Sequence, residues 1–185
     1  MVLIKPEEEV YYMKDFIKSC YSIALFTLIM ALILTRGSFA MEITSRDFQN
    51  NQSIPVIHTC DGKDVSPQLS WSGAPDRTKS FVLSCIDPDA PMGDFIHWLV
   101  YDIPATVTGI AQGGPLPAGA KEMANDFGKK SYGGPCPPSG THRYFFTLYA
   151  LKIEKLGDIN KDSFLKKVRE NQIGSARIIG LYQRR

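Results

Sequence analysis

Short apolar segments separated by turn residues make up most of the chain after residue 40. Three segments are rich in β-branched and aromatic residues, as strands usually are: 81–86, 98–103 and 144–152. In the third segment both alternating sets of side chains are largely apolar, so we predict a central strand buried on two faces. Gly-rich and Pro-rich turns lie between the segments, at 72–75, 87–91, 113–117 and 133–138. This spacing predicts antiparallel sheets with long loops rather than a parallel βαβ fold.

One helix and one further strand are predicted in the last part of the chain. The apolar stripe of the helix consists of Phe164, Leu165 and Val168. Either Asn160 or Asp162 can cap its N-terminus, and Gly174 is expected just after its C-terminus, where glycine commonly ends helices. Residues 176–182 then have the composition of a final strand.

The first 40 residues have the pattern of a secretory signal. The apolar run Ile23–Leu34 is shorter than the roughly 20 residues that a membrane-spanning helix needs. Ser38 and Ala40 follow it in the small-residue arrangement that a signal peptidase accepts. We therefore expect a signal peptide over 1–40, cleavage after Ala40 and a periplasmic or secreted mature protein. An uncleaved N-terminal anchor is the alternative.

Met13 is a better start for such a signal than Met1. Lys14 directly follows Met13 and supplies the positive charge of an n-region, whereas three glutamates at 7–9 follow Met1. The true start of the chain is therefore open between these two methionines.

The remaining residues, 41–185, have the length and apolar content of one domain with a single core. The whole chain carries a net charge of +2, and its first 40 residues hold as many basic as acidic side chains. Charges of both signs are interspersed along the domain. This pattern gives no electrostatic reason to expect binding to nucleic acid.

Three cysteines follow residue 40. Cys85 lies in an apolar segment and is typical of a core thiol, while Cys60 and Cys136 lie in Gly-rich and Pro-rich loops. In an oxidising compartment an odd number of cysteines permits one disulfide and one buried thiol. If a disulfide forms, the loop context favours Cys60 and Cys136.

Polar, titratable residues lie where the predicted strands begin or end. Asp87 and Asp89 follow the first strand, His97 precedes the second, and His142 and Tyr144 stand at the start of the third. Strand ends hold side chains rigidly, and the adjoining loops leave room for a ligand. Taken singly, each residue also has an ordinary structural interpretation, because Asp before Pro opens turns and a lone His is often a hydrogen-bonded core residue.

Three longer segments contain these residues: Asp87-Pro88-Asp89-Ala90-Pro91, Ile96-His97-Trp98-Leu99-Val100, and 134–144. In this order they resemble the phosphatidylethanolamine-binding protein family, and within it the bacterial Raf-kinase-inhibitor-like branch. The resemblance covers nearly all of the domain, since further similar segments are found at 59–71, 125–128 and 132–135.

The resemblance implies a mainly β fold: an antiparallel β-sandwich with a few peripheral helices and a small pocket at one end. This pocket would bind a phosphate-like anion or a phospholipid headgroup. Its ligand-binding residues would be Asp87, His97, Gly134, Pro135, His142 and Tyr144. Asp89 and Pro91 would shape the first loop, and Trp98 would support the second segment. The resemblance also raises the expectation of a cis peptide bond between Ala90 and Pro91 above the general rate for X-Pro bonds.

These residue types suit an anionic ligand. Two imidazoles and a phenol can donate hydrogen bonds to phosphoryl oxygens, and a Gly-Pro turn permits close approach of the backbone. A carboxylate repels phosphate, so we assign Asp87 to orienting and charging a histidine.

We interpret the domain as a non-catalytic binding protein that needs neither a cofactor nor a metal. Candidate partners are the anion or headgroup, an unidentified protein that the domain inhibits or modulates, and a second copy of the chain. The alternative is a hydrolase that uses the Asp and His residues of the pocket. Against it, the histidines lack the tight H-x-x-x-H spacing of metal ligands and a G-x-S-x-G turn, and Cys136 stands between prolines.

Overall fold

The computed structural model describes residues 40–157 and 159–184. The predicted signal segment before residue 40 lies outside the described residues, as does the choice between Met1 and Met13. Within the described residues, no helix is long and apolar enough to cross a membrane.

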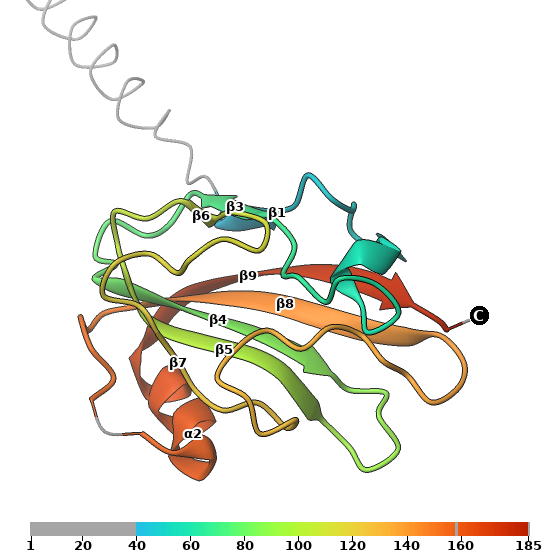
Figure 1. The fold of residues 1–185 in the computed structure, drawn as a ribbon. Helices are drawn as coiled ribbons and strands as arrows, with labels where there is room; N and C mark the ends of the chain where they lie inside the picture. Colours follow the sequence, from blue (N-terminus) through green and yellow to red (C-terminus); the bar gives the residue numbers. More distant parts are fainter. Residues whose placement is uncertain (1–39, 158, 185) are drawn as a thin grey trace, which may run out of the picture. The chain divides into compact units, whose positions relative to one another are not determined.

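Two β-sheets form the layers of the domain (Figure 1). The smaller sheet has the order β1-β3-β6, with β1 at Glu42–Thr44, β3 at Leu69–Ser72 and β6 at Gly109–Ile110. The larger sheet has the order β2-β9-β8-β4-β5-β7. Its strands are β2 (Gln52–Ser53), β9 (Gln172–Tyr182), β8 (His142–Leu151), β4 (Ser80–Asp87), β5 (Phe95–Pro104) and β7 (Lys121–Glu122). All pairs are antiparallel except the short β2–β9 pair, so the predicted antiparallel sandwich is confirmed.

The main core lies between the two sheets. It contains Ile43, Leu69, Trp71 and Ile110 from the small sheet and Phe81, Leu83, Val100, Phe146 and Leu148 from the large sheet. The strand β8 is hydrogen-bonded to β9 on one side and to β4 on the other, as predicted for a central strand. Its inner residue Tyr144 is fully buried, while Phe145 and Tyr149 on its outer face are only partly buried.

A second core lies on the outer face of the large sheet, where the helix α2 (Lys161–Asn171) packs (Figure 1). Phe164 and Val168 of the predicted apolar stripe are each 1% exposed, and burying such side chains contributes about 1.5 to 3 kcal/mol apiece. Asn160 caps the helix: its side chain accepts the Ser163 N–H, and the Ser163 side chain accepts the Asn160 N–H in return. The other described helix is the short 3-10 turn η1 (Val56–His58).

The expected role of Gly174 at the helix end is wrong. The helix ends at Asn171, and Gln172 is extended (φ −70°, ψ 141°), so the chain enters β9 directly and needs no left-handed residue. Gly174 lies inside β9, where a Cβ would come within 3.0 Å of Pro75. The final strand is therefore longer than the predicted 176–182.

Candidate functional site

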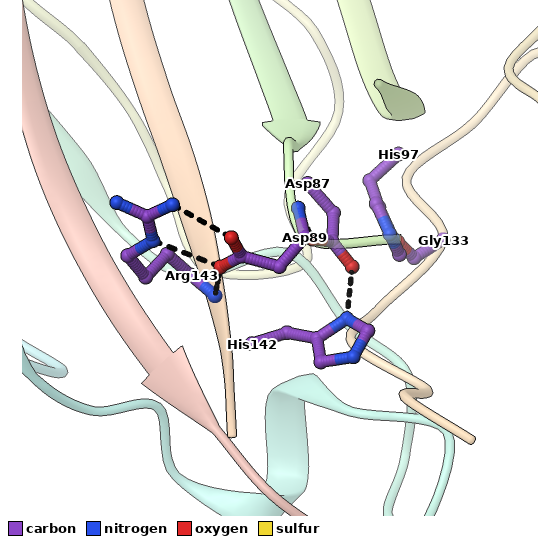
Figure 2. Close-up of polar contacts among 6 residues, drawn as sticks. All are labelled: Asp87, Asp89, His97, Gly133, His142 and Arg143. Carbon is purple, nitrogen blue, oxygen red and sulfur yellow. Dashed lines mark hydrogen bonds and ion pairs between the residues drawn. The ribbon is translucent and has the colours of Figure 1, made fainter. Parts of the chain in front are cut away.

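The ends of three neighbouring strands, β5, β4 and β8, meet at one end of the large sheet. Because β4 runs antiparallel to both β5 and β8, its last residue Asp87 lies beside the first residues of its neighbours. Figure 2 shows Asp87, His97 and His142 close together at this end of the sheet, although they are far apart in the sequence. The structure thus brings together residues that the sequence placed only at separate strand ends.

Asp87 and His142 form a buried pair. The Asp87 Oδ2 atom lies 2.7 Å from His142 Nδ1, and the two side chains are 4% and 9% exposed (Figure 2). The other oxygen of Asp87 accepts the Asp89 N–H at 2.8 Å. Because a carboxylate only accepts hydrogen bonds, His142 donates through Nδ1, and its Nε2 is left for a ligand.

A β-bulge positions His97. Cys85 pairs with Trp98, and Ile86 pairs with Ile96, so His97 is an extra residue without a partner on β4. The His97 ring contacts Tyr144, and the neighbouring Trp98 ring contacts Tyr132, so two consecutive residues face the same core. Regular strand alternation forbids this arrangement, and periodicity in the sequence could not reveal it.

His97 is held as a neutral imidazole. Its Nδ1 lies 2.7 Å from the Gly133 carbonyl, and the Gly133 N–H donates to the His97 carbonyl at 3.1 Å. A carbonyl oxygen only accepts, so the proton is on Nδ1 and the lone pair is on Nε2. Burial lowers the pKa of His97 from its ordinary value of 6.5, against the opposing effects of the Gly133 hydrogen bond and the Asp87 charge.

Tyr144 supplies a free donor beside His97. The Tyr144 ring lies 5.1 Å from the His97 ring, edge to face, and its hydroxyl is buried without a hydrogen bond to any described residue. Burial raises the pKa of Tyr144, and the Asp87 charge and a side-chain contact with Asp87 raise it further, although this contact does not satisfy hydrogen-bond geometry. A buried hydroxyl without a partner is uncommon in folded proteins. It is therefore available to a ligand oxygen.

Gly134 belongs to residues 132–136, which we call the wall segment because its Gly133 carbonyl contacts His97 at the site. Hydrogen bonds connect this segment to the loop at 58–64. The Gly134 N–H donates to Asp64 Oδ1 at 2.6 Å, and a Cβ on Gly134 would lie 2.4 Å from the His58 carbonyl oxygen. Only glycine fits such a close approach. The Pro135 carbonyl accepts the Cys60 N–H at 3.1 Å, which fixes the same contact from the next residue.

A disulfide joins the same two segments. Cys60 and Cys136 are bonded with their Cα atoms 5.4 Å apart, as the loop context favoured, and Cys85 is a buried free thiol, as expected. Tyr132 adds a hydrogen bond from its hydroxyl to the His58 carbonyl at 2.9 Å. The wall segment is thus fixed by covalent and polar contacts together.

Of the predicted pocket-shaping residues, Trp98 lies directly behind the wall segment. Its ring is 5.5 Å from the Tyr132 ring, and its Nε1–H donates to Glu122 Oε1 at 2.7 Å. Trp98 therefore supports the wall through Tyr132. Asp89 lies in the first loop and binds Arg143, and Pro91 is exposed at a turn in the same loop.

The expected cis bond before Pro91 is wrong, because no peptide bond of the described residues is cis. The Gly93 N–H donates to the Ala90 carbonyl at 2.9 Å, which closes a β-turn with Pro91 at its second position. A trans proline has the φ that this position requires, whereas a cis proline belongs at the third position of a turn.

Two contacts around the site were not assigned from the sequence. Asp89 accepts three hydrogen bonds from Arg143: from its backbone N–H at 2.9 Å, from Nε at 2.8 Å and from Nη2 at 2.6 Å (Figure 2). Chiefly through the side-chain hydrogen bond, Arg143 lowers the pKa of Asp89 to about 2. Asn125 donates to the carbonyls of His97 and Ser131 at 3.1 and 2.9 Å. Asp89 and Asn125 both lie in segments that resemble the family. Their partners Arg143 and His97 are too distant in the sequence for residue spacing to reveal these contacts.

A hollow of about 840 Å³ lies beside these strand ends, at the end of β9. It is lined by Ser53, Ile54, Val56, Asp61, Thr141, Leu181, Tyr182, Gln183 and Arg184. The hollow borders the site through Thr141, but it does not include Asp87, His97 or Tyr144. The unused polar atoms of the candidate site are thus separate from the residues that line this hollow.

The sequence matches a family model described as phosphatidylethanolamine-binding protein over residues 44–183. The chain belongs to this family. A UPF0098 protein of Aquifex aeolicus is 46% identical over 160 residues, which cover 82% of this chain and 94% of that protein. The UPF0098 protein YbcL of Escherichia coli is 38% identical over 179 residues, which cover 85% of this chain and 98% of that protein.

Solved structures of the phosphatidylethanolamine-binding protein family have the same fold as this chain. The structure of CT736 from Chlamydia trachomatis, a homologue of the family, superposes with a TM-score of 0.74 at 36% identity, covering 79% of this chain and 99% of that one. The E. coli YbcL structure, described as a new member of the mammalian family, also gives 0.74 at 36% identity, covering 78% and 99%. The family and fold inferred from the sequence are confirmed.

Proposed function

We propose that this member of the phosphatidylethanolamine-binding protein family binds a phosphate-like anion or a phospholipid headgroup. The site lies at the end of the large sheet where the ends of β4, β5 and β8 meet. The observation that carries the proposal is the set of unused polar atoms there. His97 and His142 each use Nδ1 on a protein acceptor, which leaves two Nε2 atoms, and the Tyr144 hydroxyl has no partner among the described residues. We call these groups the anion site.

Contact of the ligand with the two imidazoles of the anion site requires a proton. In their neutral forms both imidazoles present an Nε2 lone pair, so a phosphate oxygen can approach only when a proton lies between the two atoms. That proton comes from solvent or from the ligand itself, whose second pKa is about 6. Asp87 then stabilises the charge on His142 through the 2.7 Å contact, which is the role assigned to it from the sequence.

One observation favours a second candidate, the hydrolase alternative. A buried carboxylate that orients a histidine is also the arrangement of a general base. The cysteine version of this alternative loses support, because Cys136 is bonded to Cys60 and burial raises the pKa of the Cys85 thiol. A hydrolase would have to activate water at His142. Release of nitrophenol from p-nitrophenyl phosphate, lost in His142→Ala, would favour this candidate over non-catalytic binding.

We further propose that the protein acts in the periplasm or outside the cell after cleavage behind Ala40. The Cys60–Cys136 disulfide supports this, since such bonds form and persist mainly in oxidising compartments. N-terminal sequencing of the protein purified from the periplasmic or secreted fraction should return Met41 as the first residue. A protein that retains residues before Ile23 would contradict export by this signal.

Tyr144→Phe tests the anion site most selectively, because it removes only the hydroxyl without a partner. We expect phosphoethanolamine to bind this variant several-fold more weakly, with no loss of folding stability, since the buried hydroxyl makes no hydrogen bond in the free protein. Tyr101→Phe, at a partly buried position on the other face of the sheet, is the matched control and should leave affinity unchanged. Equal affinities of all three proteins for phosphoethanolamine would contradict the proposal.

A further inference from the structure

A second groove lies on the outer face of the large sheet, where α2 covers only one end (Figure 1). It has a volume of about 350 Å³ and is bordered by β4, β8, β9 and α2. Its lining includes Ile86, Phe145, Thr147, Leu165, Arg169 and Arg177. Phe145 and Thr147 alternate along β8 with the inner residue Tyr144, so the groove and the Tyr144 side of the anion site lie on opposite faces of the sheet.

Arg177 is held in one orientation on this groove. Its guanidinium carbon lies 4.6 Å from the centre of the Phe145 ring, and its Nε–H donates to Thr147 Oγ1 at 3.0 Å. Thr147 is 4% exposed, so the acceptor that orients Arg177 belongs to the rigid sheet. These two contacts leave the terminal nitrogens of the guanidinium for a ligand.

None of the residues that the structure describes neutralises the charge of Arg177. In residues 40–157 and 159–184, no carboxylate forms an ion pair with Arg177 or with Arg169 across the groove. Arg143 is the internal comparison: it lies 5.5 Å from the same Phe145 ring but is fully engaged by Asp89. Among the described residues that line the groove, Asp94 is the one carboxylate, so these residues carry more positive than negative charge.

Part of the groove wall is apolar. Ile86, Tyr149 and Leu165 are partly exposed there, beside the buried Val168. A bare inorganic ion would use the guanidinium groups but none of this surface, whereas the volume matches the lower end of the range for small-molecule sites. From these contacts we propose that the groove binds an organic anion with a carboxylate or phosphate group on an apolar body. Arg177 takes the anionic group in a forked contact, and the apolar part of the wall takes the body.

The test is a titration of the purified protein with phenylacetate, phenyl phosphate and inorganic phosphate, followed by NMR at the backbone amides of Phe145, Thr147 and Arg177. At least one organic probe should shift these amides, and the better of the two identifies the preferred anionic group. Arg177→Gln should weaken that binding about tenfold or more, since a hydrogen-bonded charge is lost. Thr147→Val, which keeps the charge but removes the orienting acceptor, should weaken it less.

Two controls keep this test separate from the anion site. Arg77→Gln makes the same change of charge at an exposed position before β4, at the end of that strand away from Ile86, and should leave binding unchanged. His142→Ala should leave the titration of the groove amides unchanged, whatever it does to phosphate binding at the anion site. The proposal is overturned if inorganic phosphate shifts the groove amides as strongly as the organic probes. It is equally overturned if no probe shifts them, or if Arg77→Gln and Arg177→Gln weaken binding alike.

Discussion

His97 and His142 are used in the same way although they come from different strands. Each spends Nδ1 on an acceptor of the protein, a carbonyl for His97 and a carboxylate for His142, and each keeps Nε2 for a ligand. The two acceptors differ in charge. The carbonyl fixes the tautomer of His97, whereas the carboxylate of Asp87 places a negative charge beside His142.

The buried His97 should make folding stability depend on pH. Burial lowers its pKa in the folded protein below the ordinary 6.5, so below that value the unfolded chain binds more protons than the folded one. The free energy of unfolding should therefore fall as pH drops through about 6.5, until the folded-state pKa is passed. Urea unfolding between about pH 7.5 and 5 should show a shallower decline in His97→Gln than in the wild type. Parallel curves would contradict a neutral, buried His97.

Asp87→Asn separates two roles of the carboxylate. If Asp87 charges His142, the amide variant keeps an acceptor but loses the negative charge, and phosphoethanolamine affinity should fall about tenfold and recover toward lower pH. If Asp87 merely repels the ligand, the same substitution should tighten binding at every pH. Calorimetric titration over a series of pH values distinguishes these results.

At the scale of elements, the Asp89–Arg143 pair connects the end of β4 to the start of β8. Arg143 lowers the folded-state pKa of Asp89 from 3.8 to about 2, so the pair stabilises the fold above pH 3.8 and loses that effect as pH falls through the folded-state value. Arg143 is 52% exposed, so screening by solvent keeps this contribution small. Double-mutant unfolding with Asp89→Asn and Arg143→Gln should give this coupling at neutral pH and a smaller coupling at about pH 2, where half of the Asp89 carboxylates in the folded protein are protonated. An equal coupling at both values would contradict the ion pair.

The sequence predicted the elements better than their junctions. Composition located β4, β5 and β8, and an apolar stripe preceded by the possible caps Asn160 and Asp162 located α2, because composition, periodicity and capping are local properties. Gly174 and Pro91 were misjudged because their conformations depend on the adjoining structure: α2 leads directly into β9, and Gly93 closes the turn at Pro91. A sequence pattern does not contain these contacts.

The candidate site was predicted residue by residue but not in its geometry. The resemblance supplied His97 and His142, yet the bulge that turns His97 inward appears only in the pairing of β4 with β5. The unused Tyr144 hydroxyl and the three bonds from Arg143 to Asp89 are likewise tertiary features. Sequence can name such residues, but pairing across the sheet decides what each one contacts.

For the whole molecule, the Cys60–Cys136 disulfide links the loop at 58–64 to the wall of the anion site across 76 residues of sequence. A closure of this length contributes about 4 kcal/mol in the chain-entropy model. Replacing both cysteines by Ser should lower the free energy of unfolding by an amount of that order and weaken phosphoethanolamine binding, because Gly134 and Pro135 are then held by hydrogen bonds alone.

The effect of a reductant controls for damage from the serines. Dithiothreitol should reproduce both losses in the wild type and change nothing further in the double variant. A reductant that lowers stability but leaves phosphoethanolamine affinity intact would show that the disulfide serves the fold and not the site.

The central claim is that the anion site holds its ligand through a proton at a histidine Nε2 atom. The most direct measurement is calorimetry of phosphoethanolamine binding at about pH 7.5 in buffers of different ionisation enthalpy, which counts the protons taken up. We predict net proton uptake in the wild type, and a marked loss of both uptake and affinity in His142→Ala. Binding heats that do not depend on the buffer, together with an affinity that is unchanged in His142→Ala, would contradict the account.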